Sequence, residues 1–304
     1  MKFFNYLKYL LKNILINFLI IIVVIFLLHL TFSSILIKEH NIKQSLKYIN
    51  NILMFQYGYI ENVLNINVST LYFSYFNNTV ILVSSSFIIS FIVGFYLAYL
   101  LAHKNKTISI KSINILIFIF SSIPVFILGP LAIIFNKTLN LPTVYIDTYL
   151  GSYWQSFLSI FTPILVLSLV IIPLVIGFNY PILKQITQSE YYSWAKANGF
   201  SKNKIFWSVI VRNWISAGLS KLVFIYIYLI TYSMIIERFF YIPGQSFIFQ
   251  YLNNPQYLNL LMYSILLNIT LIFSIKSLTD LIIYILDIKK MYTFVKIGVY
   301  KWNK

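Results

Sequence analysis

Six apolar runs of about 20 residues each limit what this chain can fold into. They lie near residues 10–33, 79–102, 113–135, 157–180, 217–236 and 259–286. A run of this length crosses the hydrocarbon core of a bilayer as an α-helix, and a helix satisfies its own backbone hydrogen bonds in lipid. The sequence therefore predicts an all-α polytopic membrane protein with six transmembrane helices.

The composition supports this class. The chain is 60% hydrophobic and only 10% charged, with a mean hydropathy of +0.82. We expect one transmembrane domain over residues 1–304, with an outer segment at 34–78 and a polar loop at 181–216. The first apolar run is too long for a signal-peptide core and no A-x-A-like cleavage site follows it, so we expect it to remain as an anchor.

Basic residues orient the predicted spans. Of the 23 lysines and arginines, 17 lie in residues 1–12, 103–112, 181–221 or after 286, intervals at or next to the span ends on one side of the membrane. Basic residues are retained on the cytoplasmic side. We therefore expect both termini and the loop 181–216 in the cytoplasm. The net charge of +16 then indicates contact with anionic lipid and not with nucleic acid.

A polar and basic island, Ser189 to Asn213, interrupts the apolar pattern between the fourth and fifth spans. Ser189 can cap a short helix, and Glu190 then falls in its opening turn, where a negative charge suits the exposed amides. Ala195 and Ala197 keep this helix slim, so a partner could approach its backbone closely. The island is either an amphipathic helix on the lipid surface or a docking site.

A glycine corner follows this helix. Gly199 fits the left-handed residue that ends a helix, and Phe200 is placed to fold back on Trp194 and Ala195 in a Schellman-type closure. Ser201 can cap the next helix. These signals predict two short helices joined at Gly199.

The residue order of the island resembles the EAA loop of ABC-importer permeases. The oligopeptide, dipeptide and nickel branch of this family carries approximately (D/E)-Y-x-x-x-A-(R/K)-A-x-G-(L/F)-S, followed by R-N. The matching residues here are Glu190, Tyr191, Ala195, Lys196, Ala197, Gly199, Phe200, Ser201, Arg212 and Asn213. The resemblance implies that this loop couples the chain to an ATPase. The proline that usually follows R-N is absent.

Four further segments resemble the same family in the same order. The family motifs are N-T-x-x-L at the second span, S-I-P-x-F in the third, E-x-x-F-x-I-P-G after the fifth and D-x-x-Y-x-x-x-D-P-R at the end. Their counterparts here are residues 78–82, 122–126, 237–244 and 280–289. The last of these has Ile288 in place of the proline and Lys289 in place of the arginine, and its tyrosine, Tyr284, lies one position later than in the motif.

Helix-breaking and polar residues near the spans have two interpretations each. Pro124 either kinks its helix or frees backbone carbonyls that line a pore. Pro243 and Gly244 form a turn whose functional interpretation is an outer lip of the pathway. Asn268 makes either a hydrogen bond between helices, which we favour, or a substrate contact.

Lys276 and Asp280 lie four residues apart on one face of the last predicted helix. They can pair there, which would offset the cost of placing single charges in the membrane. The pair either holds helices together or lines the translocation path. Because Asp280 is close to the cytoplasmic end, we favour the first interpretation.

Catalytic signals are poor throughout the chain. It has no cysteine and no H-E-x-x-H, P-loop or G-x-S-x-G motif, which argues against a nucleotide-hydrolysing site. We therefore expect a non-catalytic subunit without metal or cofactor of its own, with ATP and Mg²⁺ bound by partner subunits.

The resemblance also implies partners and a location. They are a second homologous permease subunit, two ABC ATPase subunits and an extracytoplasmic solute-binding protein, assembled in the cell membrane of a bacterium. The implied solute is a peptide, with nickel or a metal chelate as the alternative. Two interpretations of another class stay open, a membrane-embedded enzyme and a non-transporting membrane anchor.

Overall fold

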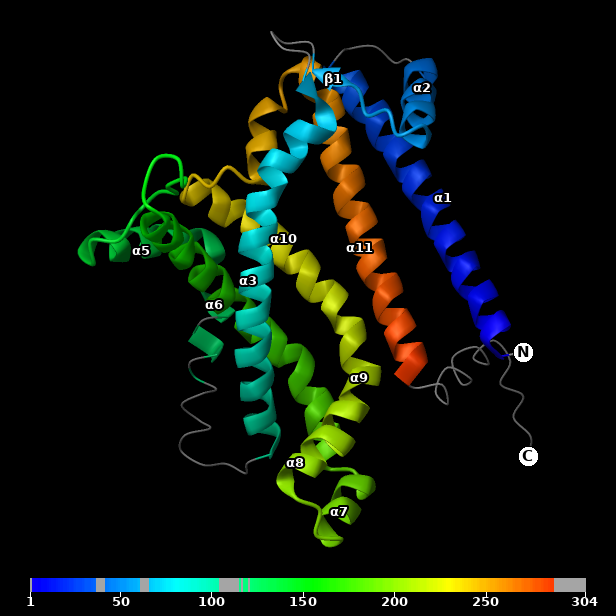
Figure 1. Ribbon diagram of the computed structural model, residues 1–304, viewed down its shortest axis with the longest axis vertical. Coiled ribbons are helices and arrows are strands. Elements are labelled where there is room, and N and C mark those ends of the chain that lie inside the picture. The colour runs from blue at the N-terminus through cyan, green and yellow to red at the C-terminus, as the bar shows by residue number, and fades with distance from the viewer. Residues whose placement is uncertain are drawn as a thin grey trace. The chain divides into compact units, whose positions relative to one another are not determined.

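The computed structural model describes residues 2–36, 42–60, 66–103, 115, 117–119 and 121–286, without the side chains of 2–10 and 284–286 (Figure 1). The chain is mostly helical. Its α-helices are α1 (Lys2–Leu36), α2 (Ile42–Leu53), α3 (Val68–His103), α5 (Val125–Thr138), α6 (Tyr153–Thr187), α7 (Glu190–Ala197), α8 (Lys202–Ile205), α9 (Arg212–Gly218), α10 (Leu222–Phe239) and α11 (Leu258–Leu286). Two short strands, β1 (Tyr59–Ile60) and β2 (Ile66–Asn67), pair antiparallel.

Shorter helical segments connect the long helices. A π-helix, η1 (Phe206–Val211), and a 3₁₀ turn, η2 (Leu219–Lys221), lie between α8 and α10. Two further 3₁₀ segments, η3 (Gln245–Tyr251) and η4 (Pro255–Tyr257), precede α11.

Five helical stretches are long and apolar enough to span a membrane. They are Leu11–Leu36, Val68–His103, Tyr153–Thr187, Lys202–Phe239 and Pro255–Ile283, and they coincide with five of the six predicted spans. The predicted span 113–135 lies partly outside the described residues. Its described part ends in the shorter apolar helix α5, so six spans remain a prediction.

Two predicted boundaries differ from the structure. Helix α3 begins at Val68, inside the predicted outer segment, because Val68, Tyr72 and Phe76 form a buried stripe at helical spacing that intervening polar residues obscure in the sequence. The second island helix is not short. It continues from Lys202 through the π-helix to Phe239, so only Gln188, Ser189 and residues 198–201 of the predicted loop separate helices.

The chain forms two compact units. Unit 1 consists of residues 1–86, 125–167 and 229–274. Within it, α2 packs on α1 (Figure 1), and α3 meets α6 where the Ser86 hydroxyl donates to the Ile164 carbonyl at 3.2 Å. A Cβ at Gly129 of α5 would lie 2.5 Å from the Phe239 ring, so only glycine permits that approach to α10.

Unit 2 consists of residues 87–124, 168–228 and 275–304, and its described part includes α7, α8 and the C-terminal half of α3. In this unit α3 and α6 approach closely at Gly94, where a Cβ would lie 2.7 Å from Val175 Cγ1. Small residues at helix crossings let backbones come together in membrane proteins. Unit 2 also contains a hydrophobic cluster in which residues of α3 and α6 pack against residues of the polar island.

Candidate functional site

The polar island begins with a capped helix, as predicted. Ser189 has extended backbone angles, and its hydroxyl oxygen accepts a hydrogen bond from the Tyr192 N–H at 3.4 Å. Glu190 is exposed in the opening turn of α7. The structure records no side-chain partner for Glu190 within the described part of the chain, so the carboxylate is left for the helix amides and for solvent.

The corner has the predicted Schellman geometry. Gly199 has a φ of +69°, which L side chains rarely adopt. The Phe200 N–H donates to the Ala195 carbonyl at 3.2 Å and the Gly199 N–H donates to the Lys196 carbonyl at 3.1 Å, the two bonds that define this motif. The Trp194 and Phe200 rings then meet edge to face, with centroids 5.9 Å apart.

A second cap restarts the helix after the corner. The Ser201 hydroxyl oxygen accepts from the Lys204 N–H at 3.4 Å, as its position in the sequence predicts. The Lys204 ammonium lies 4.0 Å from the centre of the Phe200 ring, a cation–π contact that covers one face of the corner.

The underside of the island is buried in unit 2. Tyr192, Ala195 and Ile205 are less than 10% exposed and pack with Leu183 and Ile186. Ala195 therefore packs α7 against its own membrane helices, whereas its small size in the sequence predicts close approach of a partner. Only Ala197 of the two predicted small residues is exposed.

Tyr192 anchors this underside, although no motif in the sequence singled it out. Its hydroxyl lies 3.0 Å from His103 Nδ1, at the end of α3. Burial, with a smaller effect of Tyr99, raises the pKa of Tyr192, so its hydroxyl stays protonated at neutral pH. The spacing of Tyr192 and Ala195 by one helical turn is the sequence signal that could have revealed a buried face.

The outer face of the island carries the remaining predicted coupling residues. Tyr191 and Trp194 are 45% and 61% exposed, and Glu190 and Lys196 are also exposed. Charged and aromatic side chains thus occupy one surface of a helix whose opposite face is fixed in the protein. Arg212 is exposed on α9 and does not belong to the described underside.

The second arm of the island is held by Trp214. Its indole N–H donates to the Asn179 side-chain oxygen, and its ring packs on Phe91 and Phe95. A Cβ at Gly218 would fall 2.1 Å from this ring. The π-helix η1 ends at Val211, directly before Arg212, and so precedes this contact.

A second group of predicted residues gathers in unit 1. The Glu237 carboxylate is fully buried and accepts hydrogen bonds from the Thr79 hydroxyl at 2.7 Å and the Ser246 N–H at 2.9 Å. Thr79 in turn accepts from the Gln245 N–H at 2.8 Å. Gly244 lies directly against the carboxylate, because a Cβ there would be 2.3 Å from Glu237 Cδ.

Hydrogen bonds from two helices hold the turn that contains Pro243 and Gly244. The Asn78 amide of α3 donates to the Pro243 carbonyl at 3.0 Å. The Asn268 amide of α11 donates to Gln245 Oε1, in the 3₁₀ segment η3, at 3.1 Å. Pro124 directly precedes α5.

Three buried atoms of this network have no hydrogen-bond partner within the described residues. They are Gln245 Nε2, Ser246 Oγ and Asn268 Oδ1. A buried polar atom without a partner costs about 1–3 kcal/mol. The turn is therefore firmly bonded through Glu237 and Thr79 but polar and unsatisfied on the side of Gln245.

The structure does not join Lys276 and Asp280. Lys276 is exposed and Asp280 is half-buried on α11, and no ion pair of 4.0 Å or less links them in the described part of the chain. Their pairing stays a prediction. Residues 287–289 of the last family segment lie outside the described residues.

A comparison with protein families relates this chain to known proteins. The family model described as binding-protein-dependent transport system inner membrane component matches residues 90–291, a range that includes the polar island and Glu237 but not Thr79. A search of curated proteins found no match. The chain belongs to the binding-protein-dependent transport family, whose members are inner-membrane permease components of ABC importers.

Proposed function

We propose that this chain forms half of the translocation pathway of an ATP-driven importer of peptides. It would assemble with a second homologous permease, two ABC ATPase subunits and an extracytoplasmic solute-binding protein, in the plasma membrane of a bacterium. Family membership supports the transport role. The resemblance of the island to the peptide and nickel branch supports peptide as the transported solute. Nickel or a metal chelate is the alternative solute.

The observation that carries the coupling role is the two-faced helix α7. Tyr192 and Ala195 fix its inner face to unit 2, while Glu190, Tyr191 and Trp194 project from its outer face. A force applied to the outer face is passed to the membrane helices, because the inner face cannot move independently of the cluster into which it packs. Such a helix can act as a lever between an ATPase and a membrane pathway.

The proposed mechanism is alternating access. Closure of the ATPase pair on ATP would move α7, and the membrane helices would shift between outward-open and inward-open states. Only ligands that bind the two states with different affinity can drive this change. ATP and the solute-loaded binding protein are such ligands in this scheme.

The function is tested by co-purification followed by an ATPase assay in proteoliposomes. We expect the chain to bring down an ABC ATPase, and peptide-loaded binding protein to stimulate hydrolysis and peptide uptake. A chain that binds an ATPase without stimulating it would be a non-transporting anchor. Stimulation and uptake with nickel or a nickel chelate but not with peptide would replace peptide as the solute.

Glu190→Ala is expected to weaken ATPase binding while the permease stays in the membrane at normal levels. Truncating one member of a buried charged pair costs about 2–5 kcal/mol, so affinity should fall at least about 30-fold. Within its own helix the carboxylate contributes only about 0.3–1 kcal/mol. Binding is measured by titrating the purified ATPase onto the permease, with Glu190→Asp expected to be intermediate.

A matched control keeps this test specific to the outer face. Ser193 of α7 is also exposed, and its hydroxyl donates to the carbonyl of Ser189, the N-cap of the same helix, at 3.3 Å. Ser193→Ala should bind the ATPase as the wild type does. If Glu190→Ala lowers membrane accumulation and the surviving protein binds normally, Glu190 serves its own helix and not docking.

The membrane orientation is tested with single cysteines, because the chain has none of its own. Ser201 and Thr70 are both exposed, and we propose that they lie on opposite sides of the membrane. In intact cells an impermeant thiol reagent should label Thr70→Cys and spare Ser201→Cys, which should react once the cells are opened. Labelling of Ser201→Cys in intact cells would reverse the topology.

A further inference from the structure

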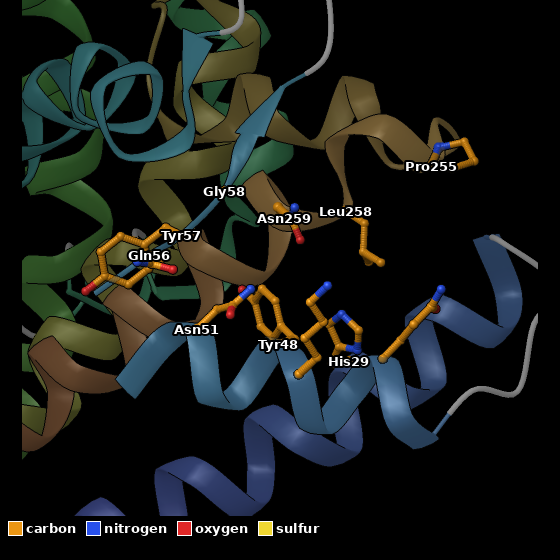
Figure 2. A pocket seen from close by; sticks show the side chains of 11 residues that line it. His29, Tyr48, Asn51, Gln56, Tyr57, Gly58, Pro255, Leu258 and Asn259 are labelled. Carbon is orange, nitrogen blue, oxygen red and sulfur yellow. The ribbon is translucent and has the colours of Figure 1, made fainter. Parts of the chain in front are cut away.

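Unit 1 contains a polar cavity that neither the coupling island nor the Glu237 network uses. It measures about 250 Å³ and lies between α1, α2, the segment before β1 and the start of α11. Figure 2 shows His29, Tyr48 and Asn51 on one side of it and Leu258 and Asn259 on the other. Its polar lining residues include His29, Gln44, Lys47, Asn51, Gln56 and Asn259.

The lining of this cavity suits an anionic, hydrogen-bonding group. Lys47 contributes a positive charge, and none of the described lining residues is acidic. Amide side chains add both donors and acceptors. Gly58, with a φ of +88°, has no room for a Cβ, which would lie 2.9 Å from Asn259 Nδ2. Gly58 and Asn259 are therefore closely packed in the wall of the cavity.

Tyr48 lies at the inner edge of the cavity with an unsatisfied hydroxyl. The residue is 7% exposed, its ring stacks on His29 with centroids 4.4 Å apart, and its hydroxyl has no hydrogen-bond partner within the described residues. Burial, with a smaller effect of Tyr57, raises the pKa of Tyr48. The hydroxyl is thus a donor at neutral pH, and an acceptor brought into the cavity would relieve its cost.

A second, apolar cavity lies next to the first in the same unit. It measures about 190 Å³, shares Tyr57 with the polar cavity, and is lined by Phe18, Ile22, Ile49, Leu53, Leu266 and Thr270, among others. Helix α2 contributes to both cavities. Gln44, Lys47, Tyr48 and Asn51 line the polar one, and Ile49, Ile52 and Leu53 line the apolar one.

The two cavities lie at different depths along the membrane helices. On α1 the polar lining residue His29 and the apolar lining residue Ile22 are seven residues apart, and on α11 the same spacing separates Asn259 from Leu266. At 1.5 Å per residue each spacing corresponds to about 10 Å. Both helices thus place the polar cavity nearer the end of the span and the apolar cavity deeper.

We propose that these cavities together bind one anionic phospholipid, with its phosphate and headgroup in the polar cavity beside Lys47 and part of an acyl chain in the apolar cavity. The order from polar to apolar follows the order in a bilayer leaflet. The surrounding membrane supplies such a molecule directly, because much of the α1 surface is exposed and apolar. The lipid would join α2 to α1 and α11.

The test uses the full-length chain released from nanodiscs that contain phosphatidylglycerol and phosphatidylcholine in equal amounts. Native mass spectrometry should show one retained phosphatidylglycerol per chain, in at least tenfold preference to phosphatidylcholine. Lys47→Gln should abolish this preference, because it removes the positive charge that favours an anionic headgroup over the zwitterionic one of phosphatidylcholine. Lys43→Gln on the same helix is the matched control, since Lys43 does not line either cavity.

The apolar part is tested by filling its cavity from two helices. Ile22→Trp and Thr270→Trp should each reduce retention at least tenfold, whereas Val23→Trp on the exposed face of α1 should retain the lipid. Size-exclusion chromatography shows whether each variant is folded. If one of the two filling variants folds poorly, the other still tests the apolar cavity.

Four outcomes with these lipids and variants overturn the proposal, and a fifth concerns a soluble ligand. The four are equal retention of both lipids by the wild type, retention unchanged by Lys47→Gln, loss of the lipid in Lys43→Gln as in Lys47→Gln, and retention unchanged in both cavity-filling variants. Displacement of phosphatidylglycerol by free glycerol 3-phosphate at similar concentration would mean that the polar cavity binds a soluble phosphate compound, and would also overturn the lipid assignment.

Discussion

Glu237→Ala is expected to destabilise unit 1 more than any of the other substitutions proposed for this chain. It would leave two buried donors, the Thr79 hydroxyl and the Ser246 N–H, without their acceptor, at about 1–3 kcal/mol each. The removed side chain also leaves a cavity, which adds to the cost. We expect a clear fall in the thermal unfolding temperature of the purified chain in detergent, with Glu237→Gln less affected.

Gly244 provides the independent check on this network. Its φ of −105° is accessible to any residue, so Gly244→Ala acts only by forcing its Cβ against the Glu237 carboxylate. We expect the single variant to lower the unfolding temperature, and to have little further effect once Glu237→Ala has removed the carboxylate. Such coupling between neighbours is what a double-mutant cycle measures.

A helical glycine serves as the control for the cycle. At Gly177 no neighbouring atom lies within 4 Å of the position that a Cβ would occupy, so Gly177→Ala should leave the unfolding temperature unchanged or raise it slightly. Additive effects of Gly244→Ala and Glu237→Ala would show that Gly244→Ala does not act through the Glu237 carboxylate, and would contradict the close contact between these two residues.

Gly199→Val is expected to uncouple the permease from its ATPase. The left-handed φ of +69° at this position costs a β-branched residue about 1–3 kcal/mol. Because no atom lies within 4 Å of a Cβ there, the effect comes from the backbone and not from a clash. The corner should open and misdirect α7, and stimulation of ATP hydrolysis in proteoliposomes should fall about 5- to 150-fold, in line with that cost.

Gly199→Asn distinguishes the effect of backbone strain at this position from the effect of adding a side chain. Asparagine tolerates the left-handed region better than other non-glycine residues, so this variant should retain most of the stimulation although it adds a side chain. If Gly199→Val hydrolyses ATP and imports peptide at the wild-type rate, the corner has no coupling role. A loss of equal size in both variants would point to a steric contact with the partner.

The local structure of the island could be predicted from the sequence because its determinants lie within a few residues of one another. Ser189 reaches the amide of Tyr192, and Phe200 bonds back to Ala195 across Gly199. Such caps depend on side-chain chemistry and on the φ preference of glycine, and both can be read from a single stretch of chain. Five of the six spans were predictable for a similar reason, since length and hydropathy are local properties.

The orientation of these elements was decided by tertiary packing. Ala195 and Ala197 are equivalent in the sequence, yet only Ala195 turns into the cluster of unit 2. The second island helix continues through a π-helix to Phe239, because Trp214 packs into its own unit and holds the helix there. The spacing of Tyr192 and Ala195 marks a buried face of α7, but only the packing of unit 2 shows which elements cover that face.

The Glu237 network and the paired cavities depend on contacts that are distant in the chain. The motif at 237–244 is visible in the sequence, but Thr79, which fixes the carboxylate, lies 158 residues earlier. Likewise α1, α2 and α11 line the cavities from both ends of the chain. A sequence pattern records which groups are available, and only the folded chain determines which of them meet, because buried donors and acceptors must find partners wherever packing brings them.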